Sequence, residues 1–259
     1  MERPHLDFCL HTRPANTARM TNGWESSAQA WIDSLGERGD FGRQFVLDPV
    51  MLPLALNAGA KTAIDIGCGE GRFCRMLKQN GVSASGLDPT PTLVARAREL
   101  DPLGTYLQAG AEQMPLADAT FDLVVSYLSL IDIPDISAAI SEMVRVLKPG
   151  GRLLVAHINA FNTAGFELGW IRSLSGSKKY FAMDHYMETR ASWEEWRGIR
   201  IVNHHRPLST YMQLFLQSGL RLTHFSEPLP SPDAPVDRAR DYVRVPWFCV
   251  MEWQKPSHP

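Results

Sequence analysis

Hydrophobic and polar positions alternate through the middle of the chain in a way that predicts strands separated by helices. Short runs of β-branched and other apolar residues predict the strands, and apolar residues at helical spacing predict the helices between them. The predicted strands are Thr62–Ile66, Ala84–Asp88, Thr105–Gln108, Phe121–Tyr127 and Gly151–His157, and the predicted helices are Arg72–Gln79, Thr92–Leu100 and Ile136–Leu147. This alternation is typical of a parallel sheet with helices on both faces.

Two further helices are predicted before the first strand. Apolar residues recur at helical spacing over residues 24–35, and Asp48-Pro49 opens a second apolar helix. Residues 1–22 are polar and aperiodic, which predicts an N-terminal arm. We therefore expect an arm over residues 1–22, followed by one domain over residues 23–259.

The pattern changes after the fifth predicted strand. Residues 159–200 combine small residues with many aromatic ones, which predicts an insertion that acts as a lid. The later elements are predicted as a strand at Ile199–His204, a helix from its N-cap Ser209 to Gln217, a strand at Leu220–Phe225, a loop over 228–240 and a final strand at Tyr242–Trp253.

Composition and charge place the chain among ordinary globular proteins. Hydrophobic residues make up 44% and charged residues 21%, and the formal net charge of −2 gives no excess of positive charge for a phosphate backbone. The sequence shows no secretory leader and no run long enough to span a membrane, so we expect a cytoplasmic protein. The four cysteines lack the paired spacing of a zinc site or a disulfide framework, so we expect reduced thiols and no metal.

A glycine-rich turn follows the first predicted strand, with the sequence Gly67-Cys68-Gly69-Glu70-Gly71. Glycine has no Cβ, so the backbone of such a turn can approach a ligand closely. Its spacing differs from the Gly-x-Gly-x-x-Gly of dinucleotide-binding proteins. Asp65 precedes the first glycine by two positions, where its charge repels a polyphosphate and attracts a cation. S-adenosylmethionine (SAM) carries an ammonium and a sulfonium and no phosphate.

A second acid lies at the end of the second predicted strand. Asp88 comes 23 residues after Asp65 in the sequence, a position from which a carboxylate can accept hydrogen bonds from ribose hydroxyls. The alternative is a turn or helix cap before Thr90-Pro91. The glycine turn and Asp88 together favour a nucleoside-containing ligand.

The order of these motifs resembles a known family. Residues 63–72 and Gly86-Leu87-Asp88 resemble motif I and the following acidic position of the class I SAM-dependent methyltransferases. Residues 110–124 and 145–151 are similar to the ubiquinone/menaquinone-type branch, known as methyltransferase domain 11. The resemblance implies a Rossmann-like α/β fold with a seven-stranded, mostly parallel sheet, helices on both faces, N-terminal helices and a lid insertion after the fifth strand.

The resemblance also implies a cofactor site. Ala111 and Glu112 would flank the adenine, and Ser126, Tyr127 and Leu128 would line the methionine portion; Glu112 has the alternative role of an acid in the first turn of a short helix. The complete predicted cofactor site is Asp65, Gly67, Cys68, Gly69, Asp88, Pro89, Ala111, Glu112, Ser126, Tyr127 and Leu128.

The acceptor side has two candidate catalytic residues. Methyl transfer from SAM is an in-line displacement that depends mainly on alignment and exclusion of water, and a base is optional. His205 begins a segment that resembles one bordering the acceptor cavity in this branch, although it could instead hold the lid by a hydrogen bond. Asp132 is a candidate base or the cap of the helix at Ile136. Members of the branch often carry a histidine pair near positions 131–132, where this chain has Ile131 and Asp132. Because of this departure, the quinone-ring substrate of the branch is not inferred for this chain.

The function predicted from the sequence is therefore methyl transfer from SAM to a small-molecule acceptor, with S-adenosylhomocysteine as the product. The alternative is a methyltransferase that transfers the same methyl group to RNA or protein. A dinucleotide-dependent oxidoreductase and a non-catalytic SAM-binding module are alternatives of other classes. We expect neither a nucleic-acid partner nor a membrane span. The sequence leaves open the acceptor, the methylated atom (oxygen, nitrogen or carbon) and the oligomeric state. The aromatic residues of 159–200 form either an acceptor box or the core of the lid.

Overall fold

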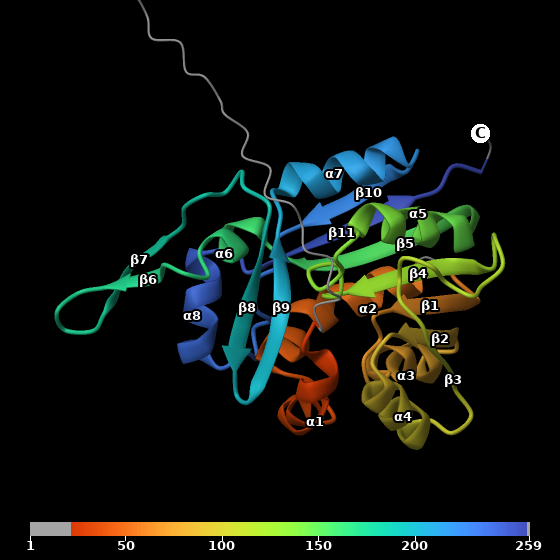
Figure 1. Cartoon of the computed structure of the whole chain (residues 1–259), viewed down its shortest axis with the longest axis horizontal. Coiled ribbons are helices and arrows are strands. Elements are labelled where there is room, and N and C mark those ends of the chain that lie inside the picture. Colours follow the sequence, from red (N-terminus) through yellow and green to blue (C-terminus); the bar gives the residue numbers. More distant parts are fainter. Residues whose placement is uncertain (1–21, 58, 258–259) are drawn as a thin grey trace, which may run out of the picture.

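The computed structural model describes residues 22–57 and 59–257 and contains the expected sheet (Figure 1). The seven strands follow the spatial order β10-β11-β5-β4-β1-β2-β3, in which β1 to β5 run parallel and β11 runs antiparallel to both of its neighbours. Their bounds are β1 Thr62–Ile66, β2 Ser83–Asp88, β3 Thr105–Gln108, β4 Phe121–Tyr127, β5 Leu147–Ile158, β10 Arg221–Ser226 and β11 Phe248–Gln254. The fold-class prediction is confirmed.

Helices cover both faces of this sheet, which buries the alternating side chains of its strands. Ala63 of β1 packs with α2 (Asp48–Asn57), α3 (Arg72–Gln79) and α4 (Pro91–Leu100) on one face. Its neighbour Ile64 packs with α5 (Ile136–Val146) and α7 (Leu208–Gln217) on the other. Because both faces are buried, the central strands are mostly apolar, as expected for a parallel sheet. Because β1, β2 and β4 run parallel, their carboxyl ends meet at one edge of the sheet.

The two predicted N-terminal helices are present, and a π-helical turn that was not predicted precedes the second. α1 spans Trp24–Leu35, whereas α2 continues directly from a π-helical turn, η1, at Arg43–Leu47. The Asp48 backbone N–H donates to the carbonyl of Arg43, and Pro49 follows without an N–H of its own. Proline removes the normal helical hydrogen bond and crowds the preceding turn, and a wider turn relieves this crowding. The prediction that Asp48-Pro49 opens the second apolar helix is confirmed, because α2 begins at Asp48. The predicted arm, residues 1–22, lies outside the described residues except for Asn22.

Residues after β5 form a small helix and two hairpins that leave the main sheet (Figure 1). These elements are α6 Ala160–Ala164, β6 Gly169–Arg172, β7 Lys178–Ala182, β8 Arg190–Trp196 and β9 Ile199–His205. The β6–β7 hairpin projects outward, whereas β9 lies against α1, where Val202 N–H donates to the Asn22 carbonyl (2.9 Å) and Ser27 Oγ to the Arg200 carbonyl (3.0 Å). The expectation that the strand near Ile199 resumes the main alternation was wrong, because β9 pairs with β8 in a sheet separate from the main one.

The C-terminal prediction needs two corrections. Residues predicted as a loop and the start of a strand form α8 (Val236–Arg244), and the last strand, β11, begins only at Phe248. α7 begins at Leu208, after Pro207, which provides no side-chain cap, so Ser209 is not its N-cap. Proline fixes φ near the value that enters a helix, and this replaces a capping side chain here. In the described residues, no helix is both long and apolar enough to cross a membrane.

Candidate functional site

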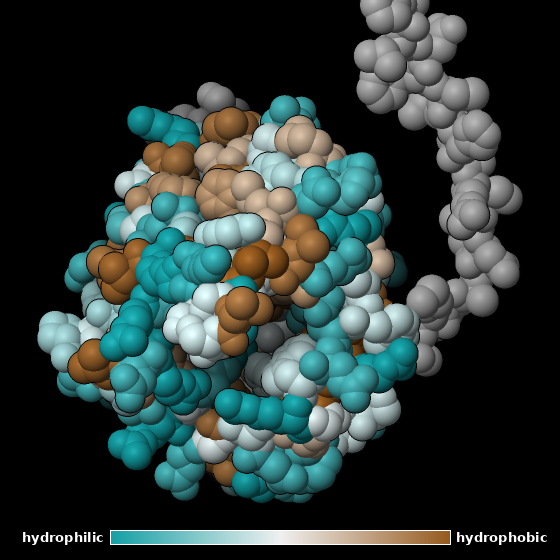
Figure 2. Space-filling model, turned by 90° about the vertical axis from the view of Figure 1, so that its left-hand side faces the viewer, coloured by the Kyte–Doolittle hydropathy of each residue, from teal (hydrophilic) through white to brown (hydrophobic). Residues whose placement is uncertain are grey.

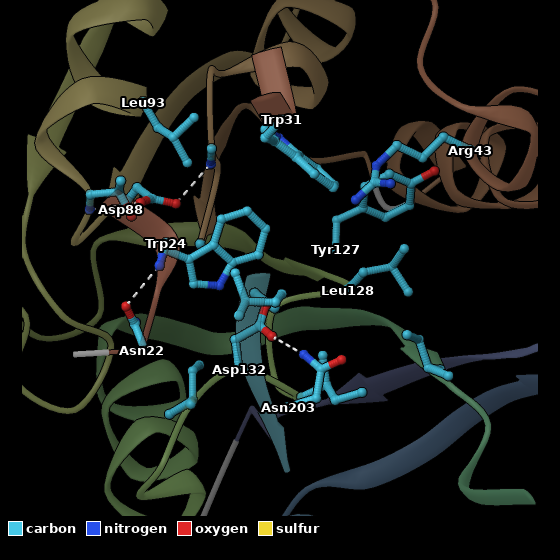
Figure 3. Close-up of a pocket in the computed structure, with 18 of the residues that line it drawn as sticks. Asn22, Trp24, Trp31, Arg43, Asp88, Leu93, Tyr127, Leu128, Asp132 and Asn203 are labelled. Carbon is cyan, nitrogen blue, oxygen red and sulfur yellow. Dashed lines mark hydrogen bonds between the residues drawn. The ribbon is translucent and has the colours of Figure 1, made fainter. Parts of the chain in front are cut away.

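A cavity of about 1090 Å³ lies at the carboxyl ends of β1, β2 and β4 (Figure 3). The glycine turn, the end of β2 and the turn after β4 form one side, while α1, the tip of the β8–β9 hairpin and α8 form the other. Ligand pockets typically measure about 300–1000 Å³. Figure 2 shows that the face from which the β6–β7 hairpin projects is hollowed, with polar and apolar side chains around the hollow.

The glycine turn adopts a conformation that other residues rarely adopt. Gly67 and Gly69 have φ angles of +74° and +57°. A Cβ on Gly67 would lie 2.4 Å from Cβ of Ser129, so the turn also needs glycine for close packing. Both glycines line the cavity.

Asp88 ties the end of β2 to the glycine turn. One carboxylate oxygen accepts a hydrogen bond from the Gly69 backbone N–H (2.9 Å), and the other accepts one from Thr90 N–H (2.8 Å). Burial raises the pKa of Asp88, while these backbone donors act in the opposite direction. The side chain lines the cavity beside Leu93 (Figure 3). The turn contact considered for Asp88 is thus present together with a position at the cavity wall, whereas the N-cap of α4 is Thr90.

The turn after β4 packs underneath the glycine turn. Ser129 Oγ donates to the Ile66 carbonyl (2.6 Å) and lies 2.8 Å from Ser126 Oγ. This attachment accompanies a left-handed Leu128, with φ of +63°, whose backbone N–H still bonds to Ala156 of β5 (2.9 Å). Strained non-glycine residues concentrate at functional sites. Leu128 lines the cavity, whereas Ser126 is fully buried and lines neither described cavity.

Asp65 lies beside a second, smaller cavity of about 50 Å³. Within the described part of the chain, one of its carboxylate oxygens has no hydrogen-bond partner. Burial and the negative charge of Asp88 raise the pKa of Asp65 to about 7, although Arg43 and Arg72 oppose this rise. A cationic ligand group beside Asp65 would stabilise its ionised form.

One basic residue at this end of the site, Arg43, was not predicted from the sequence. Arg43 lines both cavities, its guanidinium stacks 4.7 Å from the ring centroid of Trp31, and it pairs with Asp40 at 2.7 Å. The guanidinium is also 5.8 Å from the ring of Tyr127 (Figure 3). No periodic or motif signal marks Arg43, because η1 itself is not apparent from the sequence.

The structure brings most of the predicted cofactor residues together. Eight of them line the larger cavity: Gly67, Gly69, Asp88, Pro89, Ala111, Glu112, Tyr127 and Leu128. Asp65 and Cys68 line the smaller one. The two cavities share Trp31, Arg43, Gly67, Gly69 and Tyr127, so they border a common set of side chains.

Asp132 lines the larger cavity from the loop that follows β4. Asn203 of β9 donates a hydrogen bond to its carboxylate at 2.6 Å (Figure 3). Burial raises the pKa of Asp132 well above its usual value. The capping alternative was wrong, because Asp135 caps α5 by accepting from Ala138 N–H (3.0 Å).

His205 lies outside the larger cavity. It is buried, with one ring nitrogen 2.6 Å from Thr163 Oγ1 and the other 2.9 Å from the Tyr186 carbonyl. Both contacts go to the segment between β5 and β8, so the geometry is that of a histidine holding this insertion by hydrogen bonds. Burial lowers the pKa of His205, which favours its neutral form.

Its neighbour Arg206 contacts the loop that carries Asp132. The guanidinium donates to the carbonyls of Ile133 (2.7 Å) and Pro134 (2.8 Å), and more weakly to that of Leu130 (3.4 Å). Arg206 is only 5% exposed. A buried cation satisfied by carbonyl groups fixes the positions of those carbonyls, so Arg206 holds the Asp132 loop against the end of β9.

Replacing Arg206 by methionine is expected to lower the free energy of unfolding by about 3 kcal/mol, because buried carbonyls left without a donor cost about 1–3 kcal/mol each. Urea unfolding measures this loss. Arg206→Lys should restore part of it, since an ammonium can still donate to two carbonyls. Arg221→Met, at an exposed position of β10, is the control and should change stability by less than about 0.5 kcal/mol. An Arg206→Met variant as stable as the control would contradict this role.

The aromatic residues of the insertion mostly pack against one another. Trp170 and Phe181 form an edge-to-face pair with centroids 5.5 Å apart, and Phe161 stacks on Tyr186 at 5.6 Å. Trp196, at the tip of the β8–β9 hairpin, does line the larger cavity. The N-terminal Trp24 and Trp31 line it too, as an edge-to-face pair at 5.2 Å.

Comparison with known proteins agrees with this geometry. Residues 64–155 match the family model described as "Methyltransferase domain". The solved structure of an S-adenosylmethionine-dependent methyltransferase from Mesorhizobium loti superposes with a TM-score of 0.74 at 25% identity, covering 85% of this chain and all of that one. The chain contains a class I SAM-dependent methyltransferase domain. SAM is accordingly the cofactor of this domain.

Curated relatives of this methyltransferase domain are similar over only part of their length. A malonyl-[acyl-carrier protein] O-methyltransferase of Enterobacter lignolyticus is 35% identical over 107 residues, which cover 41% of this chain and 43% of that protein. An uncharacterised methyltransferase of Mycobacterium tuberculosis is 33% identical over 126 residues, covering 49% and 50%. The chain thus spans about half or less of the length of the curated relatives it matches.

Proposed function

We propose that this chain transfers the methyl group of SAM to a small molecule bound in the larger cavity. The observation that carries the proposal is a single space of about 1090 Å³ that runs from Gly69 and Asp88 to Asp132 and Asn203. This volume is at the upper end of the range for ligand pockets, about 300–1000 Å³, so the space can hold a nucleoside-type donor and a second molecule.

The residues present fit SAM by their chemistry. Asp65, with its unpartnered buried oxygen, suits the ammonium group; Arg43 suits the carboxylate; and Asp88 suits the ribose hydroxyls. When bound, SAM supplies a methyl group on a good leaving group. The chain's contribution is then to align the acceptor, to exclude water with Trp24, Trp31 and Trp196, and to receive a proton where the acceptor has one to lose.

The lining favours a small acceptor over a macromolecular one. Apolar and aromatic side chains from β5, α8 and the segment after α8 also line the cavity, namely Ile158, Tyr242 and Trp247. Such a wall binds an acceptor with a flat apolar skeleton. The net charge of −2 also gives no general attraction for a nucleic acid.

The test has two stages. Calorimetry with SAM and S-adenosylhomocysteine measures donor binding to the purified protein, and micromolar binding of both is expected. The protein is then incubated with methyl-labelled SAM and a metabolite extract, and mass spectrometry identifies labelled products. A labelled small molecule supports the proposal. The absence of donor binding contradicts the donor site, and label appearing only in protein or RNA contradicts the small-molecule acceptor.

A further inference from the structure

Asp132 is a half-buried carboxyl group in the wall of the larger cavity. It lies in the loop between β4 and α5, and the side chains around it come from other elements: Asn203 from β9 and Trp24 from α1 (Figure 3). Arg206 and the backbone of β9 hold this loop, since His204 N–H also donates to the Ile131 carbonyl (2.8 Å). Asp132 therefore has a fixed position in a wall of the cavity.

Asn203 defines which part of the carboxyl group can meet a ligand. Its amide donates to Oδ1 of Asp132 at 2.6 Å, and Asn203 is itself only 5% exposed. One carboxyl oxygen is thus held by the protein, while the cavity borders the Asp132 side chain. A carboxylate oriented in this way accepts a hydrogen bond from a ligand and takes its proton.

The chemistry of methyl transfer favours a hydroxyl group as that ligand group. An ammonium has no lone pair for the attack and is repelled by the nearby sulfonium. A carboxylate acceptor is already a nucleophile, needs no base, and would be repelled by an ionised Asp132. A hydroxyl oxygen becomes a strong nucleophile as it loses its proton, and the resulting negative charge is attracted to the sulfonium.

We propose that the acceptor is a planar, largely apolar compound with an acidic hydroxyl, of the phenol class, and that Asp132 removes the proton of this hydroxyl. The hydroxyl proton moves to the Asp132 carboxylate, and the acceptor oxygen forms a bond to the methyl carbon. The carbon–sulfur bond breaks, and its electron pair stays on the sulfur, which becomes a neutral thioether. The products are an O-methyl ether and S-adenosylhomocysteine. This inference rests on the proposed function and specifies its substrate class.

The groups around Asp132 give the reaction a defined pH dependence. Burial and the charge of Asp88 raise the pKa of Asp132, whereas Asn203, Trp24 and Arg43 lower it. Tyr211 of α7 also lies within its electrostatic range. Because the base must be ionised, the transfer rate should increase with pH through the Asp132 pKa and then level off.

The experiment compares Asp132→Asn with Asp135→Asn, a matched replacement of an exposed acid three residues away that keeps a good helix cap. Transfer to the product found in the metabolite extract should fall at least about 100-fold in Asp132→Asn. It should stay within about twofold in Asp135→Asn. S-adenosylhomocysteine affinity, measured by calorimetry, should change less than about threefold in both, which separates acceptor chemistry from donor binding.

A second variant tests the base role through the pH profile. Asn203→Leu removes the hydrogen bond that lowers the Asp132 pKa, so the midpoint of the rate profile should shift to higher pH than in the wild type. An O-methyl ether as the product, with this shift, supports the inference. An N-methyl or C-methyl product, or an unchanged midpoint in Asn203→Leu, overturns it. Donor binding without any labelled product would instead count against the proposed function itself.

Discussion

Replacing Asp88 by alanine is expected to weaken SAM binding at least about 100-fold. The carboxylate fixes the glycine turn through Gly69 N–H and the end of β2 through Thr90 N–H, at 2.9 and 2.8 Å. We expect the ribose hydroxyls to donate to the same carboxylate. Hydrogen bonds to a charged group contribute about 1.5–3 kcal/mol each, and two of them correspond to two or more factors of ten in the dissociation constant.

Calorimetry with S-adenosylhomocysteine measures this effect without interference from turnover. Asp118→Ala, at an exposed acid beside Arg145, is the control and should bind as the wild type does. Thermal unfolding in the absence of ligand shows whether Asp88→Ala is still folded. A folded Asp88→Ala protein that binds within about threefold of the wild type would show that Asp88 does not form the ribose site.

The central α/β unit could be predicted because its local patterns and its tertiary structure agree. Runs such as Phe121–Tyr127 are largely apolar because both faces of the sheet are buried, and they end at turn residues. The glycine turn adds a conformational signal, since the positive φ at Gly67 and Gly69 needs glycine. Each of these features is encoded within a few residues, so the sequence alone could identify them.

Other elements depend on partners far away in the sequence. β9 resembles a core strand, with Ile199 and Ile201 buried, but what buries it is α1 and the neighbouring hairpin strand rather than the main sheet. α8 is rich in charged residues and contains no fully buried side chain, so its sequence resembles a loop. Its contact with the core goes through Tyr242, which packs on Phe41 with centroids 5.2 Å apart.

The same limit applies to the acceptor side of the site. The sequence favoured His205 because its segment resembles one that borders the acceptor cavity, yet it is Arg206 of that segment that reaches the Asp132 loop. No sequence motif marks Asn203, because its role depends on a 2.6 Å contact with Asp132, which lies 71 residues earlier in the chain. Residue type can nominate a catalytic group, whereas the contacts that hold it in place appear only in three dimensions.

The second large effect concerns Asp65, whose replacement by asparagine should stabilise the protein while weakening donor binding. Burial raises the folded-state pKa of Asp65 to about 7, above the ordinary value of 3.8. Ionisation is therefore unfavourable in the folded state, and the stability present at low pH is lost as the pH rises toward and through 7. An increase of this size corresponds to roughly 4 kcal/mol once Asp65 is ionised.

Urea unfolding at two pH values separates this effect from a change in packing. Asp65→Asn should raise the free energy of unfolding by roughly 2–4 kcal/mol at pH 8. The increase should be smaller at pH 5, where wild-type Asp65 is protonated in the folded protein and only the unfolded chain is ionised. Asp122→Asn is a control of opposite sign, because Lys148 lowers the pKa of Asp122 and its charge stabilises the fold; this variant should be destabilised at pH 8.

Donor binding should also depend on the charge of Asp65. The ammonium of SAM should bind beside the ionised carboxylate, so Asp65→Asn should bind S-adenosylhomocysteine at least about tenfold more weakly at pH 8. Near pH 6.5 the wild type should release a proton as it binds, which calorimetry detects as a heat that depends on the buffer. A variant with unchanged stability at pH 8 and unchanged affinity would mean that the carboxylate is neither strained in the free protein nor used by the donor. If both shifts occur, the buried charge of Asp65 lowers the stability of the ligand-free protein because the same charge is needed to bind the ammonium group of the donor.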